Sequence, residues 1–228
     1  MRSTGLRCRI RPMQAGDIPQ VLDIERQSFP NMWPQTVYQR ELKNRMARYL
    51  VAYDPAEERE EVLGTSDQPP PSRGLVRLLR RLFGDPTEAT RDRILGVVGL
   101  WCMMGQGHIV TIGVREEYRR QGIGEVLLVA AIEGALEAHQ EEVTLEYRIS
   151  NDAARSLYEK YGFGKVGVRA RYYSDNQEDA VLMTTPELRS PAYGRLLARR
   201  IAEQREQWGK DYPLDGQLNE LARVIPSG

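Results

Sequence analysis

The segment "RRQGIG" at residues 119–124 contains the residue types whose spacing could do chemistry. Gly122 and Gly124 have no side-chain bulk, so backbone N–H groups at the start of a helix could approach an anion closely. Arg119 and Arg120 add positive charges with forked donors that suit phosphate. This spacing predicts an anion-binding turn, although an ordinary glycine-containing loop with solvated arginines would have the same sequence.

Two familiar nucleotide-binding motifs are excluded at this segment. A dinucleotide fingerprint needs a third glycine at the position of Leu127. The phosphate-binding loop of nucleotide hydrolases ends in Gly-Lys-Ser or Gly-Lys-Thr, and neither follows here. An anion at this turn would therefore be held by backbone N–H groups and by the arginines.

A strand and a helix are predicted on the two sides of this turn. Residues 108–114, "HIVTIGV", are rich in β-branched side chains, which is typical of a strand. Apolar residues recur at helical spacing through 119–139 and predict a helix with one buried face. The residues of that face are Ile123, Leu127, Ala130, Ala131 and Gly134.

The chain alternates strands with helices early and pairs strands late, which predicts an α/β fold with a mixed (α+β) sheet. Further strands are predicted at residues 6–13, 49–53, 94–103, 143–150, 165–173 and 178–185. Further helices are predicted at 17–29, 36–45 and 151–161, and from 186 onward. Asp17 is expected to cap the first of these helices, and Gly162 to end the third.

Composition and charge exclude several function classes. The 32 basic and 32 acidic residues give zero net charge, which argues against coating of nucleic acid, so no direct nucleic-acid partner is expected. The charged N-terminus and the lack of a long apolar run predict a cytoplasmic protein without a membrane partner. Cys8 and Cys102 form no C-x-x-C, and His108 and His139 are isolated, so neither a metal site nor a His-based triad is predicted.

Two segments differ in character from the rest. Residues 54–93 hold three consecutive prolines and dense charge, which predicts an insertion or flexible excursion. Within it, residues 73–84 carry leucines at helical spacing, which favours packing on the chain itself or on a partner subunit. Docking to an acidic surface such as ribosomal RNA or a membrane is the alternative. Residues 186–228 are charged and are expected to form a C-terminal helical extension.

The order of these motifs resembles that of the GNAT acyltransferases. The matching residues are Arg119, Gly122 and Gly124, then "LEYRISNDAARSLYEKYGF" at 145–163. This second stretch resembles the ribosomal-protein-alanine N-acetyltransferases of the RimI type within that family. The likeness covers residues 6–53 loosely and 94–185 well, and it implies a GNAT domain over 1–185 that the insertion interrupts.

The resemblance implies that the turn holds the diphosphate of acetyl-CoA, a co-substrate used without a metal. It assigns the diphosphate cradle to Arg119, Arg120, Gln121, Gly122, Ile123, Gly124 and Glu125. It also implies backbone pairing of the pantetheine arm with Ile112, Gly113 and Val114, and a coenzyme contact at Asn151 beyond the thioester. Glu125 departs in charge from the basic residue expected there, which would weaken the phosphate site unless its side chain points away.

Acetyl transfer needs a neutral amine, a polarised thioester carbonyl and a proton for the leaving thiolate. The resemblance implies that Glu146 accepts the amine proton, directly or through water, and that Tyr158 protonates the thiolate. A backbone N–H near Val114 would polarise the carbonyl. From the residues alone, Glu146 could instead be solvated or paired with Arg148, and Tyr158 could be a core aromatic.

The implied function is acetylation of the N-terminal alanine of a small-subunit ribosomal protein, by direct attack in a ternary complex. The partner would be a protein or peptide N-terminus, and Trp33, Tyr172 and Tyr173 are expected to line the acceptor groove. One alternative is an acetyltransferase for another protein or for a small amine. Another is a non-catalytic module that binds acetyl-CoA. The oligomeric state is not predicted by the sequence.

Overall fold

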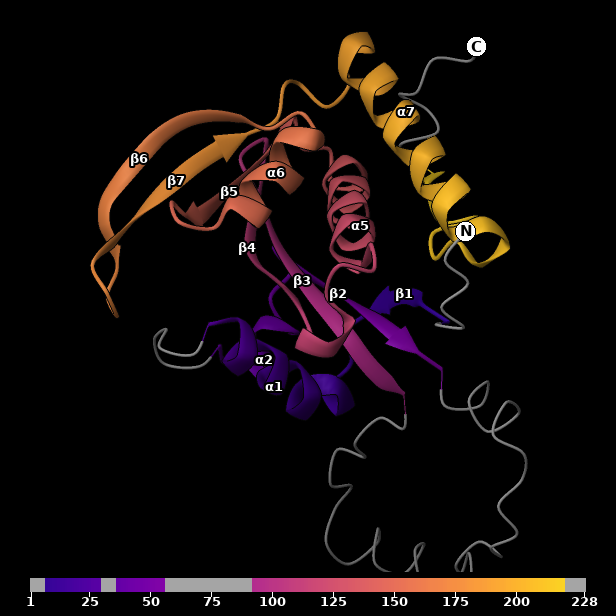
Figure 1. Ribbon diagram of the computed structural model, residues 1–228, viewed down its shortest axis with the longest axis horizontal. Coiled ribbons are helices and arrows are strands. Elements are labelled where there is room, and N and C mark those ends of the chain that lie inside the picture. The colour runs from indigo at the N-terminus through magenta and orange to yellow at the C-terminus, as the bar shows by residue number, and fades with distance from the viewer. Residues whose placement is uncertain (1–6, 30–35, 56–91, 220–228) are drawn as a thin grey trace, which may run out of the picture.

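A seven-stranded mixed sheet organises the described part of the chain, residues 7–29, 36–55 and 92–219 of the computed structural model (Figure 1). Its strand order is β1-β2-β3-β4-β5-β7-β6, and neighbours are antiparallel except β4 with β5. The strands are β1 (Arg9–Pro12), β2 (Ala47–Asp54), β3 (Arg93–Met103), β4 (Gln106–Val114), β5 (Glu142–Arg148), β6 (Gly164–Tyr173) and β7 (Glu178–Thr184). The predicted mixed α/β sheet is confirmed.

Helices cover both faces of this sheet. They are α1 (Ile18–Ser28), α2 (Tyr38–Glu41), α5 (Ile123–Glu137), α6 (Asp152–Lys160) and α7 (Pro191–Trp208), with short 3-10 turns η1 (Ala15–Asp17), η2 (Glu116–Tyr118) and η3 (Gly209–Asp211). A Cβ on Gly113 of β4 would contact Ile24 of α1, whereas one on Gly96 of β3 would collide with Leu127 of α5. Since β3 pairs Gly96 with Val114 and Val97 with Gly113, the two helices lie on opposite faces.

The parallel pairing of β4 with β5 ends partway along both strands. Paired positions run only as far as Ile109 with Leu145, although β4 continues to Val114 and β5 to Arg148. The register between β3 and β4 shifts at the same level, next to Ile109. Such a shift marks a bulge, which bends a strand away from its neighbour. In the described structure, the far halves of the two strands therefore face each other without pairing.

Helix α5 is buried on all sides, which corrects the prediction of one buried face. Every residue from Val126 to Leu136 is buried. The apolar cluster around α5 includes Tyr193, Leu197 and Ile201 of α7 as well as strand residues. Figure 1 shows α7 running beside α5. A helix that is apolar all round is stable only when it is covered on every side, and α7 provides the outer cover.

Two predicted helices are shorter than their patterns suggested. The helix predicted at 119–139 begins only at Ile123, because Arg120 and Gly122 have left-handed φ values of 62° and 90°. The helix predicted at 36–45 is only α2. After α2, the side-chain oxygen of Asn44 accepts a hydrogen bond from the backbone N–H of Met46 at 3.0 Å. This local bond favours a turn over continuation of the helix.

The predicted cap of α1 by Asp17 is wrong. Its carboxylate is fully buried and makes no side-chain cap bond to α1. It accepts two hydrogen bonds from the Arg11 guanidinium, at 2.6 and 2.9 Å, and one from the backbone N–H of Gln14 at 2.8 Å. A buried carboxylate is stable only when paired in this way, so Asp17 ties β1 to the start of α1.

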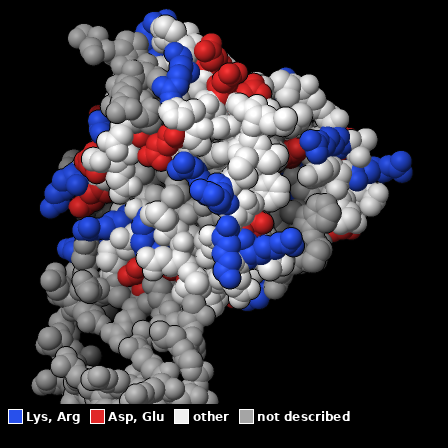
Figure 2. Space-filling model, turned by 180° about the vertical axis from the view of Figure 1, so that it is seen from behind, with Lys and Arg blue, Asp and Glu red and all other residues white. Residues whose placement is uncertain are grey.

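Several predictions lie outside the described residues. They concern Trp33 and all but the ends of the 54–93 insertion, including the amphipathic stretch 73–84. Among the residues that are described, no helix is both long and apolar enough to cross a membrane. Basic and acidic side chains are interspersed on the face seen in Figure 2, in keeping with zero net charge.

We expect Gly99→Ala to destabilise the fold, because its Cβ would stand 2.3 Å from the ring of Tyr49. Such crowding should lower the free energy of unfolding by about 1–3 kcal/mol. The matched control is Gly167→Ala, also in a strand, where a Cβ meets nothing within 4 Å. Urea unfolding of both variants would measure the difference, and equal stability of the two would contradict this packing.

Candidate functional site

A groove of about 620 Å³ lies where the end of β4, the start of α5 and α6 meet. We call it the α5–α6 groove. Ten of the predicted site residues line it, namely Ile112, Gly113, Val114, Arg119, Arg120, Gly122, Gly124, Glu125, Asn151 and Tyr158. Of the predicted coenzyme residues, two do not line it: the side chain of Ile123 is buried in the core, and the Gln121 amide donates to the carbonyl of Glu117 at 3.2 Å. The predicted base Glu146 and the hairpin residues Tyr172 and Tyr173 also lie outside its lining.

A second cavity, of about 560 Å³, lies on the far side of α5 against β2 and the C-terminal turn. Its walls include Arg48, Glu133 and Leu214. It shares no lining residue with the α5–α6 groove and contains none of the predicted site residues. Of the two cavities, the α5–α6 groove is therefore the one that contains the predicted coenzyme residues.

The turn before α5 presents backbone donors to the groove. The first intrahelical hydrogen bonds run from Glu125 and Val126 to the carbonyl of Gly122. The N–H groups of Ile123 and Gly124 precede these donors, so in a helix they have no partner of their own and point outward. Together with the positive end of the helix dipole, they suit an anion at this point.

Arg119 braces this turn. Its Nε donates to the carbonyl of Val114 at 3.2 Å, and one terminal nitrogen donates to the carbonyl of Gln27 at 3.3 Å. The guanidinium therefore links the end of β4 to the end of α1. Arg120, which is exposed and lines the groove beside it, adds positive charge there.

The carboxylate of Glu125 is held by α6. Its Oε2 lies 2.6 Å from Lys160 Nζ and accepts a hydrogen bond from the Tyr161 hydroxyl at 2.9 Å. Lys160 also lines the groove. The negative charge that the sequence places at the turn is thus compensated by a neighbouring ammonium, which sequence reasoning missed because the two residues are 35 positions apart.

Glu146 is part of a charged cluster on the sheet. Its carboxylate lies 3.1 Å from His108 Nε2 and 3.0 Å from a guanidinium nitrogen of Arg169. Burial alone would raise the pKa of Glu146, but the hydrogen bond and charge of His108 and the charge of Arg169 outweigh burial and lower the pKa. The carboxylate is therefore ionised at neutral pH.

His108 is not isolated, contrary to the sequence analysis. Its Nδ1 lies 2.9 Å from the Thr144 hydroxyl, while Nε2 faces Glu146. The pairing of β4 with β5 places His108 opposite Thr144. Glu146 is two residues further along β5, so its side chain points to the same face of the sheet. Only this register brings the histidine and the carboxylate together, and local sequence does not specify it.

Tyr158 is buried in α6 and lines the groove. Burial, and then the neighbouring Tyr173 and Tyr147, raise its pKa well above that of a free phenol. Its ring lies 5.8 Å from that of Tyr147 on β5. Since side chains alternate along a strand, Tyr147 and Glu146 point to opposite faces, so Tyr158 and Glu146 approach the parted strands from opposite sides.

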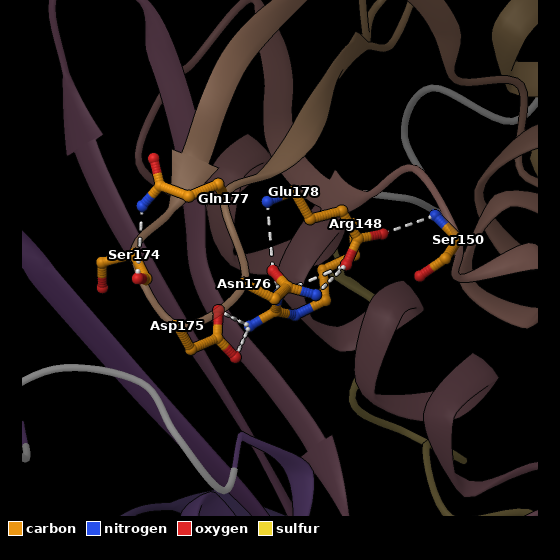
Figure 3. A network of polar contacts seen from close by, with 7 residues as sticks. All are labelled: Arg148, Ser150, Ser174, Asp175, Asn176, Gln177 and Glu178. Carbon is orange, nitrogen blue, oxygen red and sulfur yellow. Dashed lines mark hydrogen bonds and ion pairs between the residues drawn. The ribbon is translucent and has the colours of Figure 1, made fainter.

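The β6–β7 turn is fixed by Arg148, the residue considered as an alternative partner of Glu146. One guanidinium nitrogen of Arg148 donates to both carboxylate oxygens of Asp175, at 2.9 and 3.0 Å, and the other to Glu178 at 3.3 Å (Figure 3). Glu178 also accepts from the backbone N–H of Ser150 at 2.8 Å. The guanidinium lies 3.9 Å from the ring centre of Tyr173.

This network orients the predicted acceptor-groove tyrosines. The rings of Tyr172 and Tyr173 meet edge to face, with centres 5.3 Å apart. Arg169 lies 5.5 Å from the ring centre of Tyr172 and also pairs with Glu146. The hairpin aromatics are therefore linked to the Glu146 cluster, while Tyr173 is mostly buried and packs within the hairpin.

A family model described as the acetyltransferase (GNAT) family matches residues 18–163, more than half of the chain. This chain belongs to the GNAT acetyltransferase family. The resemblance of its motifs is confirmed, and the chain is an acetyltransferase.

Two relatives align with most of this GNAT chain. It is 31% identical over 175 residues to a Bacillus subtilis (strain 168) protein provisionally named ribosomal protein bS18-alanine N-acetyltransferase, covering 76% of this chain and 92% of that protein. It is 36% identical over 183 residues to an N-alpha-acetyltransferase of Sulfurisphaera tokodaii, covering 80% of this chain and 95% of the relative.

Solved structures share the GNAT fold. The ribosomal-protein-S18-alanine N-acetyltransferase of Escherichia coli gives a TM-score of 0.56 at 21% identity, covering 79% of this chain and 94% of that chain. NAA60 of Arabidopsis thaliana in complex with acetyl-CoA gives a TM-score of 0.57 at 17% identity, covering 78% of this chain and 97% of that chain. At these identities the likeness supports the architecture alone.

We expect Gly122→Ala and Gly124→Ala to have opposite effects on stability. Gly122 has φ of 90°, and its Cβ would stand 3.2 Å from Trp208 Nε1. Alanine there should lower the free energy of unfolding by about 1–2 kcal/mol. Gly124 lies in the first helical turn, where its Cβ would make ordinary contacts at 3.8 and 3.9 Å, so alanine should be neutral or stabilising by up to about 1 kcal/mol. Chemical unfolding measures both, and an unaltered Gly122→Ala would contradict the turn geometry.

Proposed function

We propose that this GNAT enzyme is an N-alpha-acetyltransferase that transfers acetyl from acetyl-CoA to the N-terminal alanine of a small-subunit ribosomal protein. One observation carries the proposal. The α5–α6 groove joins a turn suited to an anion with the end of β4 that does not pair with β5, and Tyr158 lines it, while Glu146 lies just past the last β4–β5 pair on the opposite face of β5. A donor and an acceptor can therefore meet there in a ternary complex, and the amine can attack directly.

The residues of the groove fit the coenzyme. Outward N–H groups at the start of α5, with Arg120 beside them, suit the diphosphate. The edge of β4 at Ile112, Gly113 and Val114 is turned to the groove and suits an amide-containing arm. Bound acetyl-CoA would supply the acetyl group as a thioester.

We assign Glu146 as the acceptor of the amine proton. Its lowered pKa keeps it ionised at neutral pH, so it has a free lone pair for the proton, directly or through one water. An α-amine has a pKa of about 7.7–8.0, so a fraction of it is already neutral near pH 7 and a modest base suffices. His108 and Arg169 orient the carboxylate from two directions.

We assign Tyr158 as the donor of a proton to the leaving thiolate. Its raised pKa keeps the phenol protonated, and its position in the groove wall brings it to the coenzyme's side of the sheet. A backbone N–H near Val114 would polarise the thioester carbonyl. Asn151 caps α6 through a 3.0 Å bond from the Ala154 N–H, which leaves its amide N–H groups to contact the coenzyme.

The acceptor is proposed from the relatives. One is provisionally named a ribosomal protein bS18-alanine N-acetyltransferase and another an N-alpha-acetyltransferase, and both names specify amines at protein N-termini. Tyr172 beside Arg169 would contact the first residues of such a peptide. Another protein N-terminus or a small amine is the second candidate, and a cytoplasmic location would suit a ribosomal substrate.

The first experiment offers acetyl-CoA with a short peptide that begins with alanine, and follows its intact mass. We expect a single acetyl gain at the α-amine. The control is the same peptide with a blocked N-terminus, which should gain nothing. Acetyl-CoA binding without acetylation of the peptide would refute this peptide acceptor and favour another protein N-terminus or a small amine.

Tyr158→Phe should lower kcat by roughly 10²–10⁴-fold, the usual contribution of a positioned acid or base. The matched control is Tyr147→Phe, because Tyr147 is the neighbouring buried ring and does not line the groove. Steady-state kinetics and the Kd of acetyl-CoA would be measured for both. Equal kcat values for the two tyrosine variants would rule out Tyr158 as the acid.

Glu146→Gln should also lower kcat, because the amide cannot accept the amine proton, while the Kd of acetyl-CoA should stay as in wild type.

A further inference from the structure

The C-terminal helix α7 reaches the α5–α6 groove although it lies beyond residues 18–163, the part that the family model matches. Gln207, near the end of α7, lines the groove together with Arg120, Gly122 and Lys160. Trp208, the last residue of α7, lies against Gly122, so the end of this helix contacts the turn that precedes α5. A segment outside the family pattern thus forms part of the groove wall.

Two side-chain N–H donors of α7 converge on Gly122. The position that a Cβ of Gly122 would occupy lies 3.2 Å from Trp208 Nε1 and 3.6 Å from Gln207 Nε2. Among the described residues, Trp208 Nε1 is a buried donor with no hydrogen-bond partner. Leaving such a donor unpaired is unfavourable by about 1–3 kcal/mol, so the packing of Trp208 against the Gly122 turn is maintained at a cost in stability.

A chain of buried hydrogen bonds fixes α7 to this turn. Gln204 accepts from the Tyr212 hydroxyl at 2.8 Å and donates to the Tyr161 hydroxyl at 2.5 Å. Tyr161 in turn donates to Glu125 at 2.9 Å. These hydrogen bonds therefore connect Tyr212, just after η3, with the first turn of α5, and they hold the Glu125 carboxylate on the side of Lys160.

We propose that α7 is a wall of the coenzyme site and that the Gln207 side-chain amide donates a hydrogen bond to the diphosphate of acetyl-CoA. Trp208 packs over Gly122 and sets the turn, while Gln204 positions Glu125 so that its charge is compensated. Gln207 is a neutral donor beside Arg120 and Lys160, so it adds direction to a site whose charge those residues already supply. This inference rests on the proposed use of acetyl-CoA.

The test is calorimetric titration of the full chain with CoA and with dephospho-CoA, which keeps the diphosphate but lacks the 3′-phosphate. Gln207→Ala should raise the Kd of both ligands by about tenfold, as expected for one hydrogen bond to a charged group. Gln207→Glu, which has equal size but replaces the donor with a negatively charged acceptor, should raise the Kd of both ligands further. The matched control is Glu206→Ala, the exposed neighbour that does not line the groove, which should bind as wild type.

The outcomes separate this inference from the proposed function. Wild type that binds no CoA would refute the use of the coenzyme and this inference with it. Wild type that binds CoA, with both Gln207 variants binding equally well, would overturn the role of Gln207 alone. If Gln207→Ala weakens binding of CoA but not of dephospho-CoA, the contact is to the 3′-phosphate, and the diphosphate assignment is overturned.

Discussion

The site depends on one constraint: β4 and β5 pair in parallel only as far as Ile109 and Leu145 and then part. At that point, the register places His108, one residue before the last pair on β4, beside Glu146, one residue after it on β5. Beyond it, the edge of β4 is turned to a groove rather than to a strand. A continuous parallel ladder would use those backbone groups for the sheet, so a ligand arm could not pair with them. The bulge that parts the strands is therefore as necessary to the site as any side chain.

The parted strands also separate the two groups to which we assign the proton transfers, Glu146 and Tyr158. Glu146 stays ionised because His108 and Arg169 stabilise its charge on one face, whereas Tyr158 stays neutral because burial on the other face penalises a phenolate. When their environments differ in this way, two neighbouring titratable groups can remain one deprotonated and the other protonated at the same pH. The Arg148 network keeps the adjoining hairpin in place without using Glu146, since Arg148 pairs with Asp175 and Glu178.

Features set by local sequence could be predicted, whereas features set by the pairing or packing of distant segments could not. The strand, turn and helix around Gly122 were predictable because glycine spacing and β-branched runs act over a few residues. Tyr158 followed from a family motif. His108, Lys160 and Gln207 were not predictable, because each reaches the site through pairing or packing with a distant segment. The start of α5 was misplaced for a local reason, since helical spacing does not reveal the left-handed backbone at Arg120.

The composition of α5 connects the extension with the site. An amphipathic α5 would need only the sheet beneath it, yet this helix is apolar all round and requires an outer cover. Helix α7 covers it with Tyr193, Leu197 and Ile201, and the same helix ends at the turn that precedes α5. Packing of the core thus determines where Gln207 and Trp208 lie. The helix that buries α5 also has its last turn at the α5–α6 groove, so if the groove holds acetyl-CoA as we propose, stability and ligand recognition share one element.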